Sequence, residues 1–274
     1  MDELIDSLIK GTDKRLEKLE KLLYTILTDY LQDELDISGN RIKYTKKNIS
    51  IVERIDSLTG KFGTAFDQLI GYIIDGIKQT IGLTTKDLSK FDTKAIMFGS
   101  DVIDEITKHS ATSINQNINL KVIFADVKSS AITLMSKPEG ISLKELRNLL
   151  SDKIIDKKIA RRYYSRWTHD IYSQYQRVAS NKVRIKIGLK YAFYQGGLIE
   201  TSRSFCNQRN GKVFSEKEIL SWNGLEWVGK PEIGYDAITD LGGYNCRHRL
   251  DWISEELARI KRPDLFMGKI LENV

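Results

Sequence analysis

The sequence predicts an α+β protein that is predominantly helical, with a helical N-terminal domain (1–140) followed by a small basic α+β domain (141–274) that contains a long basic helix and short strands. Apolar residues in the first half recur at steps of three and four, as on the buried face of a helix. The segment 138–140, Pro-Glu-Gly, marks the clearest boundary, because proline and glycine together end regular structure. After Gly188, short apolar and aromatic segments alternate with glycine turns, which is typical of short strands.

The first expected helix carries a narrow apolar stripe of the bundle or coiled-coil type. Its members are Leu16, Leu19, Leu23, Ile26 and Tyr30. The stripe covers about two heptads, which is too short for a free-standing coiled coil. Thr12 or Asp13 is the expected N-cap, because an oxygen of either side chain can accept a hydrogen bond from a free helical amide.

A second helical series follows a break at Gly39 and Asn40. It consists of Ile55, Leu58, Phe62, Phe66, Leu69, Ile73 and Ile77, and it is interrupted by Gly60, Gly63, Gly71 and Gly76. Each glycine costs about 1 kcal/mol of helix propensity relative to alanine. Because glycine permits close approach, we expect this element to pack inside a bundle or a subunit contact. Further helices are expected over 84–91, 101–109 and 120–135.

In the second half, a capping-box pattern at Ser142 and Glu145 predicts a short helix through Leu150. A long polar helix is expected over 152–187. The same pattern at Ser215 and Glu218 predicts a helix that runs toward Trp222. Short strands are expected over 191–194, 212–214 and 250–253, and a tail helix from Ser254.

The composition excludes several classes of protein. Hydrophobic residues make up 41% of the chain and charged residues 29%, so it can bury a core and is not disordered throughout. No run of 18 apolar residues exists, which predicts no membrane span, and the acidic start predicts no signal peptide. Two cysteines make no disulfide framework and fit a reducing compartment.

Positive charge is concentrated in the second half. The formal net charge of +6 divides into −2 for residues 1–140 and +8 for residues 141–274. Residues 153–190 alone carry eleven Lys and Arg against two Asp, and such a run attracts phosphates. A solvated or partner-facing surface fits these charges equally well. The aromatic residues of the same run have helical spacing, which favours a buried face over base stacking. The expected phosphate contacts are Arg161, Arg162, Arg166, Lys182, Arg184 and Lys186.

Cys206, Cys246 and His248 are the candidate metal ligands. Two thiols and an imidazole suit Zn²⁺, but a structural zinc site normally has four ligands and a Cys-x-x-Cys pair. Structural zinc and a metal-free packed cluster therefore both stay open, and the packed cluster is favoured. A disulfide between the cysteines is disfavoured by the compartment. The chain has no P-loop, Gly-x-Ser-x-Gly or His-Glu-x-x-His motif, which counts against an enzyme.

An ordered set of residues marks part of the second half. The set is Gly197, Arg203, Cys206, Gly211, Gly242 and the tetrapeptide Asn245-Cys246-Arg247-His248. It resembles the Mu F-like minor head proteins of tailed phages, over about residues 155–253. That family has a Thr-Arg-x-x-His element, a short glycine-containing hairpin and a terminal Asn-Cys-Arg-Cys. Here Cys206 lies near the position of the family's His, and His248 replaces the family's last Cys, so two Cys and one His are kept.

The resemblance implies a non-enzymatic structural protein of the virion that acts in head morphogenesis. Such a protein is present in few copies and associates with the portal, with other capsid proteins and with packaged double-stranded DNA, which it binds without sequence preference. It would be made in the host cytoplasm and located in the head interior or at the portal vertex. On this view the N-terminal helices supply portal contacts or homo-oligomer contacts.

Two other functions stay open. One is a small zinc-dependent nuclease that uses Cys206, Cys246 and His248, although no carboxylate stands out as its general base. The other is a DNA-binding regulator with a helical dimerisation half, which would prefer a specific duplex sequence.

Overall fold

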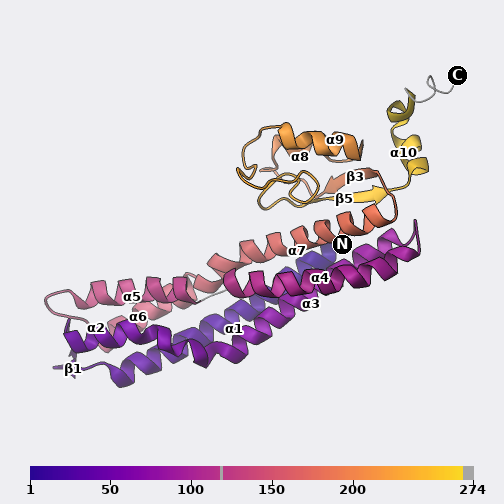
Figure 1. The fold of residues 1–274 in the computed structure, drawn as a ribbon. Helices are drawn as coiled ribbons and strands as arrows, with labels where there is room; N and C mark the ends of the chain where they lie inside the picture. The colour runs from indigo at the N-terminus through magenta and orange to yellow at the C-terminus, as the bar shows by residue number, and fades with distance from the viewer. Residues whose placement is uncertain (118–119, 268–274) are drawn as a thin grey trace. The chain divides into compact units, whose positions relative to one another are not determined.

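The computed structural model describes residues 1–117 and 120–267, apart from the side chains of residues 108–117, 162, 163, 165 and 166. The chain is predominantly helical and carries a small C-terminal antiparallel sheet, which confirms the predicted fold class (Figure 1). The α-helices are α1 (Asp2–Glu34), α2 (Lys46–Glu53), α3 (Gly63–Leu88), α4 (Lys94–Asn117), α5 (Lys121–Met135), α6 (Leu143–Leu150), α7 (Ile159–Lys186), α8 (Ser204–Arg209), α9 (Glu216–Ser221) and α10 (Glu255–Lys261).

Short 3₁₀ segments, a π-helical turn and five strands complete the described structure. The 3₁₀ segments are Arg54–Phe62, Trp222–Gly224 and Pro263–Phe266, and the π-helical turn is Ser151–Asp156. The strands are β1 (Ile37–Ser38), β2 (Arg41–Ile42), β3 (Tyr191–Gly196), β4 (Lys212–Ser215) and β5 (His248–Ile253).

The chain forms two compact units, each discontinuous in sequence. The helical unit comprises residues 8–73 and 111–167, and the sheet unit comprises residues 1–7, 74–110 and 168–274. The predicted division into a helical domain (1–140) and a basic α+β domain (141–274) stays a prediction.

The helical unit is built on the leucines of α1. The buried stripe includes Leu16, Leu19 and Leu23 as predicted, but it then steps by four to Leu27 and Leu31. Ile26 and Tyr30 are only half-buried, because the spacing from Leu23 onward follows the 3.6-residue helical period more closely than the 3.5-residue period.

The expected N-cap at Thr12 or Asp13 is wrong, because α1 begins at Asp2. Thr12 lies inside the helix, and its hydroxyl donates to the Leu8 carbonyl at 2.9 Å. The second apolar series starts on the 3₁₀ segment and continues on α3, where Leu69, Ile73 and Ile77 are buried.

Close helix packing in the helical unit occurs at a glycine that the sequence did not single out. A Cβ atom at Gly11 of α1 would collide with the hydroxyl of Tyr72 on α3, and the Arg15 guanidinium lies 3.5 Å from the centre of the Tyr72 ring. A Cβ atom at Gly60, Gly63 or Gly71 would meet nothing within 4 Å, so these glycines permit no close contact within the chain, and the expected subunit contact stays a prediction.

The expected single helix over 152–187 is interrupted. The π-helical turn ends at Asp156, and Lys158 has a positive φ of 49°, so α7 begins only at Ile159. The expected short helices over 84–91 and 101–109 belong to longer ones: α3 runs to Leu88, and α4 covers the second segment.

The sheet of the sheet unit has the antiparallel strand order β4-β3-β5. Tyr194 pairs with Lys212 on one side and Leu250 on the other, and Gly196 at the end of β3 pairs with His248. All three strands lie where the sequence predicts them. Both predicted capping boxes are present, at Ser142 and Ser215, and the side chain of Ser254 caps α10.

Within the described residues, no helix combines the length and the apolar character needed to cross a membrane.

Candidate metal centre

The three candidate ligands come from separate elements of the sheet unit. Cys206 lies on α8, Cys246 lies in the loop before β5, and His248 is the first residue of β5. In extended backbone, side chains two residues apart point to the same face. Cys246 and His248 can therefore both face α8, which brings Cys206 to them.

The distances between these groups fit a shared metal ion. The sulfurs of Cys206 and Cys246 are 3.9 Å apart, and the Cys246 sulfur lies 3.8 Å from Nδ1 of His248. All three ligand atoms lie within 4.8 Å of one another, and each residue is 3% exposed. Tetrahedral zinc with its usual bond lengths places two sulfurs about 3.8 Å apart, and a sulfur and a nitrogen about 3.6 Å apart. The cluster could hold a metal ion.

Gly242 makes room for the two sulfurs. A Cβ atom at this position would lie 2.5 Å from the Cys206 sulfur and 3.1 Å from the Cys246 sulfur. Any other residue would therefore have to displace the thiols. A position that only glycine can occupy beside two sulfurs supports a metal site at this point of the fold.

An aromatic shell surrounds the cluster. The Tyr194 hydroxyl lies 3.3 Å from the Cys206 sulfur, and its ring stacks on His248 with centres 5.0 Å apart. Tyr194 also makes edge contacts with Phe205 and Trp222. This shell excludes water, so burial raises the pKa of Tyr194 and keeps its hydroxyl protonated.

Arg177 of α7 fixes the loop that carries Cys246. Its guanidinium is 6% exposed and donates to the carbonyls of Thr239 and His248, each at 3.1 Å, and to the carbonyl of Cys246. Among the described residues, no carboxylate forms an ion pair with it. Burial raises the pKa of Asp240 while the charge of nearby Arg177 acts in the opposite direction, so Asp240 supplies one negative charge near Arg177, and a thiolate of the cluster would add another.

The two thiols of the cluster differ in how easily they lose a proton. The pKa of Cys246 is lowered by the hydrogen bond with Cys206, and also by His248 and the charge of Arg177. The pKa of Cys206 is raised by its hydrogen bond with Cys246 and by burial. Cys246 is thus the first to become the thiolate that a metal requires.

His248 contains a buried atom without a partner. Its Nε2 makes no hydrogen bond with any described residue, and the ring is enclosed. Such orphaned buried polar atoms are rare and call for an explanation. A metal ion bound at Nδ1 would leave this Nε2 without a partner, so the orphaned atom does not bear on metal binding, whereas the donor set and the Gly242 site fit a bound metal.

Of the ordered set in the sequence, Cys206, Gly242, Cys246 and His248 meet at this centre, and other members act in neighbouring loops. Arg203 donates to the carbonyls of Val228 and Tyr244, at 3.2 and 2.8 Å, and thereby joins two loops. The side chain of Asn210 accepts from the amide of Gly196 at 3.1 Å.

Comparison of the whole chain with protein-family models, curated proteins and solved structures found no match.

Two of the expected phosphate contacts are engaged within the protein. In the helical unit, Arg161 forms an ion pair at 2.8 Å with Glu20, which is 1% exposed, and its backbone amide donates to the same carboxylate. In the sheet unit, Arg184 is 3% exposed, pairs with Glu216 at 2.7 Å and lies 4.1 Å from the centre of the Trp252 ring. A phosphate could reach Arg184 only after rearrangement.

Lys182 and Lys186 of α7 are more accessible. Lys182 pairs with Glu105 at 2.7 Å, and Lys186 lies 3.9 Å from Asp101, with lysine side chains 38% and 43% exposed. Such exposed pairs are weak and exchange readily with other partners. The side chains of Arg162 and Arg166 lie outside the described residues. The six phosphate contacts stay a prediction.

The sequence did not single out Arg177 or Tyr194 as parts of the site. The sequence contains one signal for Arg177, which belongs to a series of polar residues at steps of three and four. The series is Ser173, Arg177, Ser180 and Arg184. Four polar residues at that spacing share one face of a helix, and this face is buried. Nothing local distinguishes Tyr194 from an ordinary core aromatic residue.

Proposed function

We propose that this chain is a structural minor head protein of a tailed phage that acts in head morphogenesis, beside the portal and the packaged DNA. One observation carries the proposal. Cys206, Gly242, Cys246 and His248, which belong to the ordered set that resembles the Mu F-like family, meet at one buried point. Residues scattered over about forty positions form a single centre, which supports a shared architecture beyond a chance match of short motifs.

The centre would hold one zinc ion through Cys206, Cys246 and His248. Zinc suits this donor set, and its charge would stabilise two thiolates in a buried place. The Tyr194 hydroxyl lies beside one of these ligands, at 3.3 Å from the Cys206 sulfur. With so few strands in the sheet, the ion would serve to fasten α8 and the 225–247 loop to β5.

Burial favours this structural role over a nuclease. A catalytic zinc site keeps an open position for water and substrate. All three candidate ligands are 3% exposed and lie under an aromatic shell, so a phosphodiester could not approach them without local unfolding. The nuclease is therefore the weaker proposal.

DNA contact would come from the accessible face of α7. Lys182 and Lys186 supply exposed ammonium groups, and their neighbours on the basic run add to the positive potential. The double variant Lys182→Gln/Lys186→Gln is expected to lower affinity for random duplex DNA about equally across sequences, and to reduce the salt slope by about two. The matched control Lys212→Gln/Lys217→Gln removes the same charge from exposed lysines outside α7 and leaves the slope unchanged.

The head assignment is tested on particles. An antibody against the purified chain is used to probe phage heads separated on a density gradient, with portal protein as the internal reference. We expect the chain in DNA-filled heads, at a few copies per portal. Heads that contain portal but lack the chain would reject the assignment, whatever the chain's affinity for DNA.

A further inference from the structure

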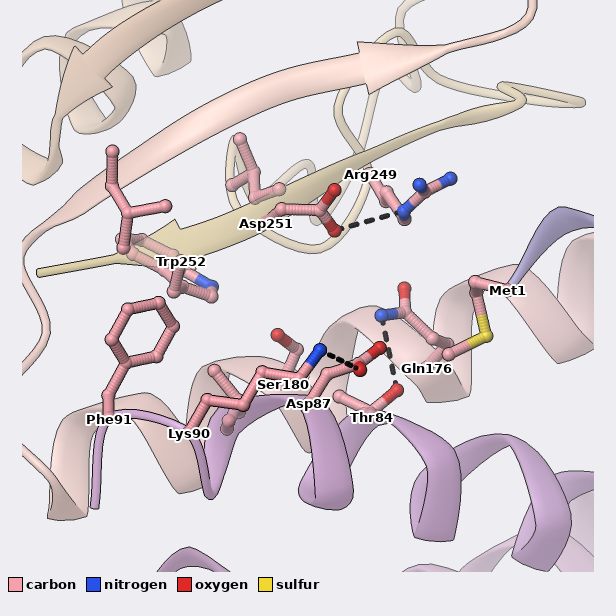
Figure 2. Close-up of a pocket in the computed structure, with 13 residues that line it drawn as sticks. Met1, Thr84, Asp87, Lys90, Phe91, Gln176, Ser180, Arg249, Asp251 and Trp252 are labelled. Carbon is pink, nitrogen blue, oxygen red and sulfur yellow. Dashed lines mark hydrogen bonds and ion pairs between the residues drawn. The ribbon is translucent and has the colours of Figure 1, made fainter. Parts of the chain in front are cut away.

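Two parts of the sheet unit could carry further chemistry. One is a cavity of about 270 Å³ between β5 and the helices α3 and α7, shown in Figure 2. Its lining offers both signs of charge, with Arg249 paired to Asp251 and Lys90 paired to Asp87, so it does not define a ligand. The other part is the pair of buried cysteines, whose chemistry without a metal is narrowly defined.

The two thiols are placed to react with each other. Cys206 and Cys246 are the only cysteines of the chain. The fold brings their sulfurs to 3.9 Å across forty positions of sequence, and both thiols are free. A disulfide bond is about 2.05 Å long, so the sulfurs need to approach each other by about 2 Å. Rotation of the two side chains about their Cα–Cβ bonds supplies a movement of that size.

Space for this movement lies beside both sulfurs. A Cβ atom at Gly242 would be 2.5 Å from the Cys206 sulfur and 3.1 Å from the Cys246 sulfur, and the glycine leaves that volume open. The Tyr194 hydroxyl, 3.3 Å from the Cys206 sulfur, is held only by a weak acceptor. The surroundings of the sulfurs therefore suit a bond between them as well as a shared metal.

The thiols are buried, but they lie next to exposed positions of the chain. Each cysteine is 3% exposed. Asn245 and Arg247, on either side of Cys246, are exposed, and so is Asn207 beside Cys206. Local opening of such loops is a low-energy motion, and it admits an oxidant as small as hydrogen peroxide.

We propose that Cys206 and Cys246 form an intramolecular disulfide when a peroxide oxidises them, and that this bond releases the metal. The bond depends only on the placement of the thiols, whereas the release rests on the proposed zinc centre. In a phage head, the dithiol would hold zinc in the reducing cytoplasm of the host. It would become a disulfide once the particle meets an oxidising medium.

The reaction consumes both thiols and one peroxide. In the metal-free protein, one sulfur attacks a peroxide oxygen, the O–O bond breaks, and the departing hydroxide leaves as water with the thiol proton. The second sulfur then attacks the sulfenic acid so formed, the S–O bond breaks, and the hydroxyl leaves as water with the second thiol proton. The sulfurs are oxidised and the peroxide oxygens are reduced. When zinc is bound, these protons come from solvent.

The disulfide and the metal exclude each other. A metal binds thiolates, and a disulfide has none. After oxidation only His248 of the three candidate ligands remains, and a single imidazole does not retain zinc.

The bond is tested on the metal-free full chain treated with hydrogen peroxide, then unfolded in iodoacetamide and weighed by mass spectrometry. We expect a monomer that has lost two hydrogen atoms and takes up no iodoacetamide. Tryptophan fluorescence before unfolding reports that the chain is folded. The controls Cys206→Ser and Cys246→Ser each keep one thiol and should end as sulfenic or sulfinic acid. A folded wild-type chain that gives these acids, or a disulfide-linked dimer, in place of the internal disulfide would overturn the proposal.

The release is tested on the zinc-loaded chain under the same oxidant, with a chromogenic chelator as the readout. We expect one zinc released for each disulfide formed, and zinc taken up again after reduction with a phosphine. Disulfide formation without loss of zinc would overturn the release. A reduced chain that never retains zinc would instead reject the zinc centre, and the test of the bond in the metal-free chain would still decide the disulfide.

Discussion

The cores of the two units are built from different kinds of side chain. In the helical unit the buried residues of α1 are mostly leucines, and Thr12 and Glu20 are the polar exceptions. In the sheet unit the region around β3 and β5 contains aromatic rings, two cysteines, a histidine and a buried arginine. Aliphatic packing is non-directional, whereas thiols, imidazole and guanidinium stabilise a fold only when their partners are in place.

This contrast indicates where each unit is vulnerable. Loss of one methylene group in the helical unit leaves the rest of an apolar core intact. The sheet has three short strands and long connections, so it has little apolar area with which to absorb the loss of a polar contact. We therefore expect the stability of the sheet unit to depend on a few polar groups, and the stability of the helical unit to change little with many single substitutions.

The largest effect is expected at Arg177. Arg177→Met removes the donors of three backbone carbonyls at once and is expected to lower the free energy of unfolding by about 4 kcal/mol. Chemical denaturation monitored by the tryptophans would measure it. Arg177→Lys is the control that keeps the charge but cannot reach all three carbonyls.

The two Arg177 variants also separate charge from packing. Because the Arg177 charge lowers the pKa of Cys246, the thiolate absorbance of the metal-free protein should titrate at higher pH in Arg177→Met than in Arg177→Lys. Identical titrations in the two variants would show that the arginine acts through hydrogen bonds alone.

A smaller effect is expected at the buried ion pair of the helical unit. Arg161→Leu leaves the Glu20 carboxylate buried without its cation, and we expect a loss of about 3 kcal/mol. The double variant Glu20→Leu/Arg161→Leu removes both charges and should recover most of that loss. If the single and the double variant are equally destabilised, packing rather than charge holds this site.

The smallest effects are expected at the two capping boxes, one in each unit. Ser142→Ala and Ser215→Ala should each cost about 1 kcal/mol, because each leaves a helical amide unpaired. The destabilising effects of the two variants should differ in how they depend on bound metal. After chelation, Ser215→Ala should have no further effect on a sheet unit that has already loosened, whereas Ser142→Ala should keep its full effect. Thermal melts with and without chelator measure both.

Acid should weaken the box at Ser142. The pKa of Glu145 is lowered by the hydrogen bonds from Ser142, so its stabilising contribution is present at neutral pH and is lost as the pH falls through that lowered pKa. The difference between the wild type and Ser142→Ala should shrink accordingly in melts at decreasing pH.

Local patterns were sufficient for much of the fold. The two capping boxes, the three strands of the sheet and the helix that ends at Met135 follow from residues that act on their immediate neighbours. The start of α1 at Asp2 and the turn before Ile159 did not follow. An early acidic, mixed-polarity segment becomes helical through tertiary packing, and a π-helical turn leaves little trace in hydrophobic spacing.

The candidate site divides in the same way. The inventory of Cys206, Cys246 and His248 can be read from residue type and order. The inward direction of Arg161 and Arg184 could not be predicted, since their partners Glu20 and Glu216 lie 141 and 32 positions away. The basic run in the sequence gives the number of positive side chains. Carboxylates from distant positions determine which of those side chains stay accessible to a phosphate.

The central claim is that Cys206, Cys246 and His248 hold one zinc ion that fastens the sheet unit. Native mass spectrometry of the full chain, supplied with Zn²⁺ and then exchanged into metal-free buffer, tests it most directly. The account predicts one zinc per wild-type chain, with protons displaced from the thiols, and none in Cys206→Ser/Cys246→Ser. A wild-type chain that keeps its tertiary structure and retains no zinc would contradict it.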